Sequence, residues 1–94
     1  MKEHTLDLYY FEQCPFCQIV MQALRVTGLE EKVTYYDIHE NHKYKEKLIA
    51  DTGRGTVPCM YIDGKPMHES RDIANWLHEY ARKLQHGEET EGRA

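Results

Sequence analysis

Two cysteines, Cys14 and Cys17, are the side chains best suited to chemistry in this sequence of 94 residues. Only Pro15 and Phe16 separate them. A cysteine thiolate can attack a disulfide or bind a metal, and a second thiol three residues away can form a disulfide with the first. Three cysteines in total are too few for a stapled framework, so the pair indicates a catalytic or metal-binding site.

The position of this pair favours redox chemistry. Residues 5–11 alternate as a strand covered on both faces, and a helix fits from Pro15 to about residue 27. If Cys14 is the N-cap, its sulfur faces the unpaired N–H groups of the first helical turn, which stabilise a thiolate. Such sites lower a cysteine pKa from ~8.5 to roughly 3.5–7.5. We therefore predict Cys14 as the nucleophile, the deeper Cys17 as the resolving thiol and Phe16 as a substrate contact at the rim.

The remaining elements alternate between strands and helices. We expect a strand at 33–38, a helix at 39–51 ended by Gly53, and strands at 56–62 and 65–67 joined by an Asp-Gly turn. A last helix runs from about Ser70, a suitable N-cap, to residue 84. The order βαβαββα predicts an α/β domain over residues 1–85, with a mixed four-stranded sheet and helices on both faces. Residues 86–94 read as a disordered tail.

Composition excludes several classes of protein. The net charge is −4, with 12 Lys and Arg among 16 acidic residues, whereas nucleic-acid binders show a basic stripe. No run approaches the ~18 apolar residues of a membrane span, and the first residues lack a signal-peptide pattern. We expect a cytoplasmic monomer without nucleic-acid or membrane partners.

A second motif precedes the third strand, where Val57 is followed by Pro58. A proline here fits an edge strand or a bulge, and a cis peptide bond is the rarer alternative. The combination of Y-Y-F-E-Q-C-P-F-C, T-V-P and D-G-K-P-M-H-E-S-x-D-I-x-x-W-L resembles the glutaredoxins of the thioredoxin fold over about residues 5–84. The resemblance implies a cis Pro58 facing the cysteines and a Val57 backbone that pairs with the cysteine of glutathione.

The start of the last helix departs from many glutaredoxins, which carry a Gly-Gly turn there. Glu69-Ser70 instead resembles the glutamyl-binding corner of glutathione-transferase N-terminal domains. Helix N–H groups and the Ser70 hydroxyl can bind a carboxylate, and Glu69 can meet the adjacent ammonium. Helix capping explains the same residues.

Charges before the first cysteine also differ from the family pattern. Glutaredoxins often carry a basic residue there, but this chain has Glu12-Gln13. The glycine carboxylate of glutathione then needs another cation, for which Arg54 is the best-placed residue and Lys47 lies behind it. A solvated surface charge is the alternative for either residue, and the better one for Lys47.

The sequence therefore predicts a glutathione-dependent thiol–disulfide oxidoreductase with glutathione as co-substrate and no metal. Its protein partners would be disulfide-containing or glutathionylated proteins. Alternatives are a carrier that binds an iron–sulfur cluster through Cys14 and glutathione, and a thioredoxin-like disulfide reductase. A zinc site of Cys14, Cys17 and Cys59 lacks a fourth ligand, and Cys59 more commonly would be a buried free thiol.

Overall fold

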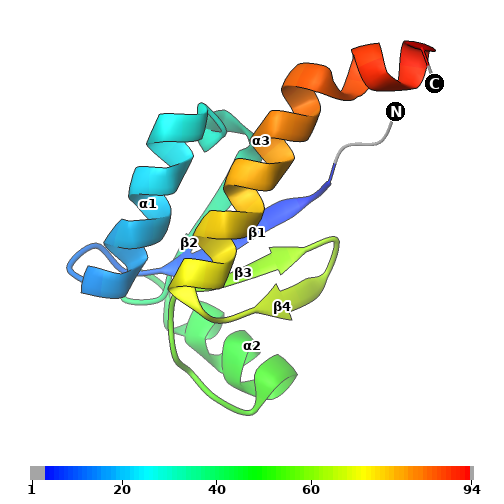
Figure 1. Cartoon of the computed structure of the whole chain (residues 1–94). Helices are drawn as coiled ribbons and strands as arrows, with labels where there is room; N and C mark the ends of the chain where they lie inside the picture. The colour runs from blue at the N-terminus through cyan, green and yellow to red at the C-terminus, as the bar shows by residue number, and fades with distance from the viewer. Residues whose placement is uncertain (1–3, 94) are drawn as a thin grey trace.

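The computed structural model describes residues 4–93, and it gives side-chain positions for residues 4–85. The strands and helices follow the predicted order, with one added 3-10 turn, η1 (Figure 1). Their bounds are β1 (Leu6–Tyr10), α1 (Pro15–Thr27), η1 (Glu30–Lys32), β2 (Val33–Asp37), α2 (His42–Thr52), β3 (Cys59–Ile62), β4 (Lys65–Met67) and α3 (Ser70–Arg93).

The four strands form one mixed sheet in the order β2-β1-β3-β4. β1 pairs with β2 in parallel and with β3 in antiparallel orientation, and β3 pairs with β4 in antiparallel orientation. A parallel neighbour requires a crossover, which α1 supplies after β1. The carboxyl ends of β1 and β2 therefore lie at the same edge of the sheet, and the cysteine pair follows β1 there.

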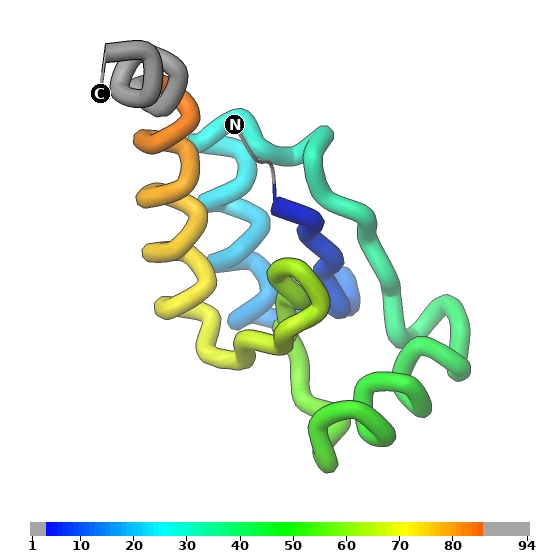
Figure 2. Tube along the Cα trace, turned by 90° about the vertical axis from the view of Figure 1, so that its right-hand side faces the viewer, coloured from blue at the N-terminus to red at the C-terminus, as the bar shows by residue number. Residues whose placement is uncertain are grey.

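Helices cover both faces of the sheet, as predicted. α1 and α3 lie together on one face, and α2 lies on the other (Figure 2). Successive residues of β1 point to opposite faces, so Leu8 enters the first core and Tyr9 the second. The first core also holds the buried side chains of α1 and α3, among them Leu24 and Leu77. The second core packs Leu48 of α2 against the sheet.

α2 begins three residues later than predicted. The Asp37 carboxylate accepts hydrogen bonds from the backbone N–H groups of His39 (2.8 Å) and Glu40 (3.3 Å), which holds residues 38–40 in a turn. The Asn41 side chain then accepts from the Lys43 N–H at 2.9 Å and caps the helix. Two local side-chain acceptors therefore displace the helix start.

β3 also begins later than predicted, at Cys59 instead of residue 56. The peptide bond between Val57 and Pro58 is cis, and residues 54–58 form a connection outside the sheet. The cis bond confirms what the family resemblance implied for Pro58. The 3-10 turn η1 before β2 was not predicted.

α3 begins at Ser70, so its N-cap is Glu69 rather than the predicted Ser70. The Glu69 carbonyl accepts a hydrogen bond from the Ile73 N–H at 2.9 Å, which is the first bond of the helix. α3 runs to Arg93, past its predicted end at residue 84. The structure describes no side chains for residues 86–94, and the disordered tail predicted there stays a prediction. None of the helices, over the described residues, is long and apolar enough to cross a membrane.

Candidate active site

Cys14 is the N-cap of α1, as predicted from Pro15 at the first helical position. Its backbone is extended, and its N–H donates to the Phe11 carbonyl at 3.2 Å. Its sulfur accepts a hydrogen bond from the Cys17 backbone N–H at 3.2 Å. The sulfur therefore satisfies one of the helix's unpaired donors and lies at the positive end of the helix dipole.

Cys17 lies one turn deeper in the molecule. It is fully buried, whereas Cys14 retains 4% of its surface. Burial raises the pKa of the Cys17 thiol to about 12, and the hydrogen bond with Cys14 adds to this effect. All three cysteines are free thiols in this structure. At neutral pH the Cys17 thiol is therefore protonated, and it lies beneath Cys14.

The loop before β3 approaches Cys14 from the other side. The Cys14 sulfur lies 3.9 Å from the Val57 carbonyl oxygen, just before the cis bond to Pro58. None of the described residues accepts a hydrogen bond from the Val57 N–H. This peptide unit is thus open to pair with an extended peptide beside the sulfur.

A cavity of about 270 Å³ lies next to this loop. Its walls come from the start of α1, the 54–58 connection and the turn into α3, which are distant in sequence. All six residues predicted to contact glutathione line it, together with two that the sequence reasoning missed, Thr56 and His68: Phe16, Arg54, Thr56, Val57, Pro58, His68, Glu69 and Ser70. Cys14 borders this group through Val57 without lining the cavity itself.

The cavity wall combines opposite charges. Arg54 and Glu69 are exposed, and the side chain of Lys47 is directed elsewhere, into an ion pair with Asp51. His68 has a buried Nε2 atom without a hydrogen-bond partner among the described residues. Burial lowers the pKa of His68, and the charge of Arg54 lowers it further, so the ring is neutral at pH 7. The wall therefore offers one cation and one carboxylate.

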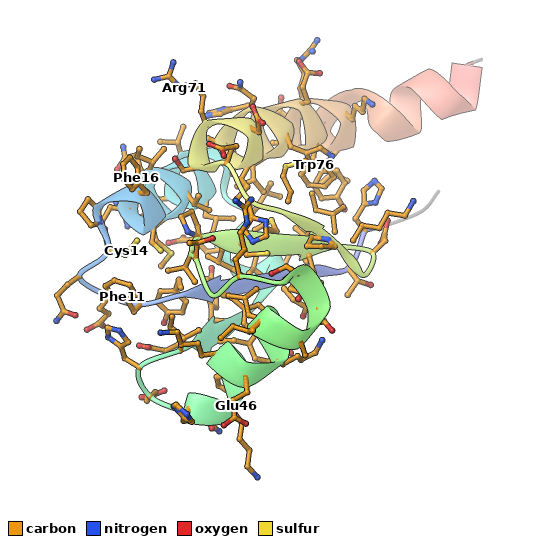
Figure 3. All side chains as sticks on the ribbon, turned by 90° about the horizontal axis from the view of Figure 1, so that it is seen from below. Phe11, Cys14, Phe16, Glu46, Arg71 and Trp76 are labelled. Carbon is orange, nitrogen blue, oxygen red and sulfur yellow. The ribbon has the colours of Figure 1, made fainter. Side chains whose placement is uncertain are left out.

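Aromatic rings flank Cys14 on both sides. Figure 3 shows Phe16 and Phe11 on either side of Cys14, with Arg71 beyond Phe16 at the start of α3. Phe16 is 63% exposed, and Phe11 stacks on His39 with ring centroids 4.1 Å apart. The stack was not predicted, because residues 39 and 40 were assigned to a helix.

Cys59 belongs to a different environment. It is fully buried in the second core, where burial raises its thiol pKa to about 11. Over the residues with described side chains, no group of three or more His, Cys, Asp or Glu side chains is arranged to hold a metal ion. The zinc alternative thus gains no support from the placement of Cys14, Cys17 and Cys59.

Comparison with known proteins identifies the family and the fold of the chain. The family model described as "Glutathione S-transferase, N-terminal domain" matches residues 8–85. Among curated proteins, Protein IN2-1 homolog A of Oryza sativa subsp. japonica is 34% identical over 76 residues, which are 78% of this chain and 30% of that protein. Glutaredoxin-C4, chloroplastic, of the same organism is 36% identical over 53 residues, 55% of this chain and 40% of that protein.

Solved structures share the fold. Glutaredoxin C1 from Populus tremula x tremuloides, in its holo form, has a TM-score of 0.61 and 25% identity, covering 86% of this chain and 80% of that one. The chain spans only 30% and 40% of the two curated relatives' lengths. The fold is the thioredoxin-like fold shared by glutaredoxins and glutathione transferases, and the chain belongs to the family of glutathione S-transferase N-terminal domains.

Proposed function

We propose that this protein is a glutathione-dependent thiol–disulfide oxidoreductase in which Cys14 is the nucleophile. One observation carries the proposal: the Cys14 sulfur occupies the N-cap of α1, 3.9 Å from the Val57 carbonyl that borders the cavity. Helix N-termini favour the anionic form of a group placed there, and the thiolate is the species that attacks a disulfide.

The proposed reaction has two exchange steps. The Cys14 thiolate attacks the glutathione sulfur of a protein–glutathione mixed disulfide, so that a Cys14–glutathione disulfide forms and the protein leaves as a thiolate that takes a proton. A second glutathione thiolate then attacks the glutathione sulfur on Cys14. Glutathione disulfide leaves, and the Cys14 thiolate is regenerated.

Cys17 offers a second way to resolve the intermediate. Its thiol lies on the next turn of α1, and once deprotonated it can attack Cys14 to give an intramolecular disulfide and free glutathione. Because burial raises the Cys17 pKa to about 12, this branch needs a base or an opening of the helix start. We propose that glutathione resolves most turnovers and that Cys17 acts on protein disulfides. Two glutathione molecules then reduce the Cys14–Cys17 disulfide and leave as glutathione disulfide.

The cavity supplies the groups that glutathione requires. Glutathione is a tripeptide with two carboxylates and one ammonium group. We place its cysteine along the open peptide unit of Val57, its γ-glutamyl end against Glu69 and the N-terminus of α3, and its glycine carboxylate toward Arg54. Phe16 and Pro58 provide apolar walls, and Ser70 provides a hydroxyl at the helix start.

Reduction of a glutathione mixed disulfide, coupled to glutathione reductase, tests this function. We expect wild type and Cys17→Ser to turn over the disulfide of glutathione and 2-mercaptoethanol, and Cys14→Ser to be inactive. Cys59→Ser is the matched control, because its thiol is buried in the other core. Turnover retained in Cys14→Ser contradicts the proposal.

Glutathione conjugation is a second candidate, favoured by the family model that covers residues 8–85. It requires that the cavity activates bound glutathione toward an electrophile instead of presenting it to Cys14. Conjugation that persists in Cys14→Ser, without disulfide turnover in wild type, would select this candidate. For either function we propose a monomer in the reducing cytoplasm, where glutathione is available.

A further inference from the structure

We infer that the surface on the far side of Cys14 from the glutathione cavity recognises cationic protein segments, so that the preferred substrates carry their glutathionylated cysteine among Lys and Arg residues. This inference rests on the proposed function and names its substrate class. We call the surface the acidic rim and define it by Phe11, Glu12, Asp37, His39 and Glu40.

The two sides of Cys14 differ in charge. The cavity side carries both signs of charge: Arg54 and Glu69 on the wall, and Arg71 and Asp72 in the first turn of α3 (Figure 3 labels Arg71). The rim side carries three acidic residues at the carboxyl ends of β1 and β2. Tyr10 at the end of β1 pairs with Asp37 at the end of β2, and Phe11 stacks on His39, so Glu12 and Glu40 follow at the same edge of the sheet. Burial raises the pKa of Tyr10, and the charges of Asp37, Glu12 and Glu40 raise it further.

Basic residues are absent from the chain segments that form the acidic rim. No Lys or Arg occurs between Lys2 and Arg25, and none occurs between Lys32 and Lys43. The acidic charge of the rim is therefore not neutralised within its own segments. Glu12 and Glu40 are exposed, and the Asp37 carboxylate is held in place because it accepts the N–H groups of His39 and Glu40.

The acidic rim also contains two stacked rings, those of Phe11 and His39. Phe11 and the exposed His39 stack with their rings 17° from parallel, and the Phe11 carbonyl accepts the Cys14 N–H. The rim is thus attached directly to the residue that carries the reactive sulfur. Aromatic rings beside carboxylates suit Lys and Arg side chains, whose cations bind ring faces and carboxylates alike.

The glutathione cavity and the acidic rim lie on opposite sides of Cys14, so each can bind one half of a mixed disulfide. When glutathione fills the cavity, the protein half of a mixed disulfide covers the remaining surface around Cys14, which is the acidic rim. Charge complementarity raises the rate of encounter and selects among partners more than it raises affinity. The expected signature is therefore a salt-dependent difference in kcat/KM between substrates of opposite charge.

Two glutathionylated peptides test the inference, identical except that Lys or Glu residues flank the cysteine. We expect the wild type to reduce the Lys peptide with a kcat/KM about tenfold higher than the Glu peptide at low salt, and the ratio to fall toward one at high salt. The double variant Glu12→Lys/Glu40→Lys should bring the ratio below one. Glu30→Lys/Glu31→Lys, in η1 before β2, adds the same charge away from the rim and should keep the wild-type ratio.

Each result has a defined meaning. Equal rates for the two wild-type peptides overturn the inference, as does an unchanged ratio in the rim variant or an equal change in the η1 variant. The disulfide of glutathione and 2-mercaptoethanol, whose 2-mercaptoethanol half carries no charge, separates the two proposals. If wild type turns over this disulfide but ignores peptide charge, only the acidic rim fails. If it does not turn over this disulfide, the proposed function fails and the inference fails with it.

Discussion

The Cys14 sulfur accepts the backbone N–H of Cys17 at 3.2 Å, so the two members of the C-x-x-C pair interact through the peptide group of one and the side chain of the other. This bond fixes the sulfur over the first turn of α1. It also places the Cys17 thiol beneath that turn, where burial raises its pKa to about 12. One local geometry therefore gives the two thiols different chemistry.

Selective alkylation follows from this difference. At pH 7 we expect iodoacetamide to modify Cys14 in the folded protein more than about tenfold faster than Cys17 or Cys59. The two other thiols are fully buried, and their pKa values are raised to about 12 and about 11. Mass spectrometry of peptides after a short reaction gives the measurement. Equal labelling of the three cysteines in the folded state would contradict it, and labelling after denaturation is the control.

Alkaline stability should depend on Cys59. Its folded pKa of about 11 lies above the ordinary 9.0, so the folded state keeps a proton that the unfolded chain loses. The protonated Cys59 thiol therefore contributes to the free energy of unfolding below pH 9, and this contribution is lost as the pH rises toward 11. Relative to Cys59→Ala, the wild type should lose about 2 kcal/mol of unfolding free energy across this window.

Urea unfolding of both proteins with a reductant present measures this effect. Tyrosines and Cys17 titrate in both proteins, so the comparison isolates Cys59. A constant difference between wild type and Cys59→Ala from pH 8 to pH 11 would show that the thiol does not remain protonated in the core.

Asp51 connects α2 to the sheet. Its carboxylate accepts the Tyr61 hydroxyl at 2.9 Å and pairs with Lys47, and these bonds, that with Lys47 first, lower its pKa. A lowered folded pKa gives stability that is present above the unfolded value of 3.8 and lost as the pH falls below it. Asp51→Asn should therefore lower the melting temperature at pH 7 and have a smaller effect at pH 3.

Thermal unfolding at both pH values checks this prediction. Glu46→Gln provides the control, because Glu46 is exposed on the same helix and its carboxylate lies 3.4 Å from the exposed His42 ring. If Asp51→Asn lowers the melting temperature equally at pH 3 and pH 7, the charge of the Asp51 carboxylate does not stabilise the fold.

Arg54 should contribute to glutathione affinity. Its side chain is exposed on the cavity wall, while its backbone is held by Thr52, whose hydroxyl bonds to both the N–H and the carbonyl of Arg54. Arg54→Gln should therefore leave the loop in place and raise the Kd for S-methylglutathione about tenfold, the loss expected for one charge-assisted contact. Calorimetry measures the Kd, with Arg82→Gln on α3 as control. An unchanged Kd would show that the glycine carboxylate of glutathione does not bind Arg54.

The architecture was predictable because its signals are local. Pro15 at the first turn fixed the start of α1, Gly28 adopts φ +74° at its C-cap, and the Asp63-Gly64 pair makes the β3–β4 turn. Apolar periodicity then assigned each remaining element its type. The order of these elements was enough to place Cys14 at the junction of a strand and a helix.

Boundaries and tertiary neighbours were less predictable. The Asp37 turn and the Asn41 cap displaced α2, although both are residues that compete locally with helix backbone bonds and could have indicated the boundary. His68 was missed because its role on the cavity wall depends on the approach of Arg54, which no local pattern encodes. Phe16 was predicted from its place beside Cys14, whereas the other five predicted cavity residues depended on the family resemblance, since separate segments supply them.

The central claim is that Cys14 alone forms the covalent intermediate with glutathione. Its most direct test is to mix Cys17→Ser with a glutathionylated peptide in the absence of free glutathione and to locate the adduct by intact and peptide mass spectrometry. We expect one glutathione per protein, attached to Cys14, and its release when glutathione is added. An adduct on Cys59, or no adduct while the peptide is still reduced, would contradict the account.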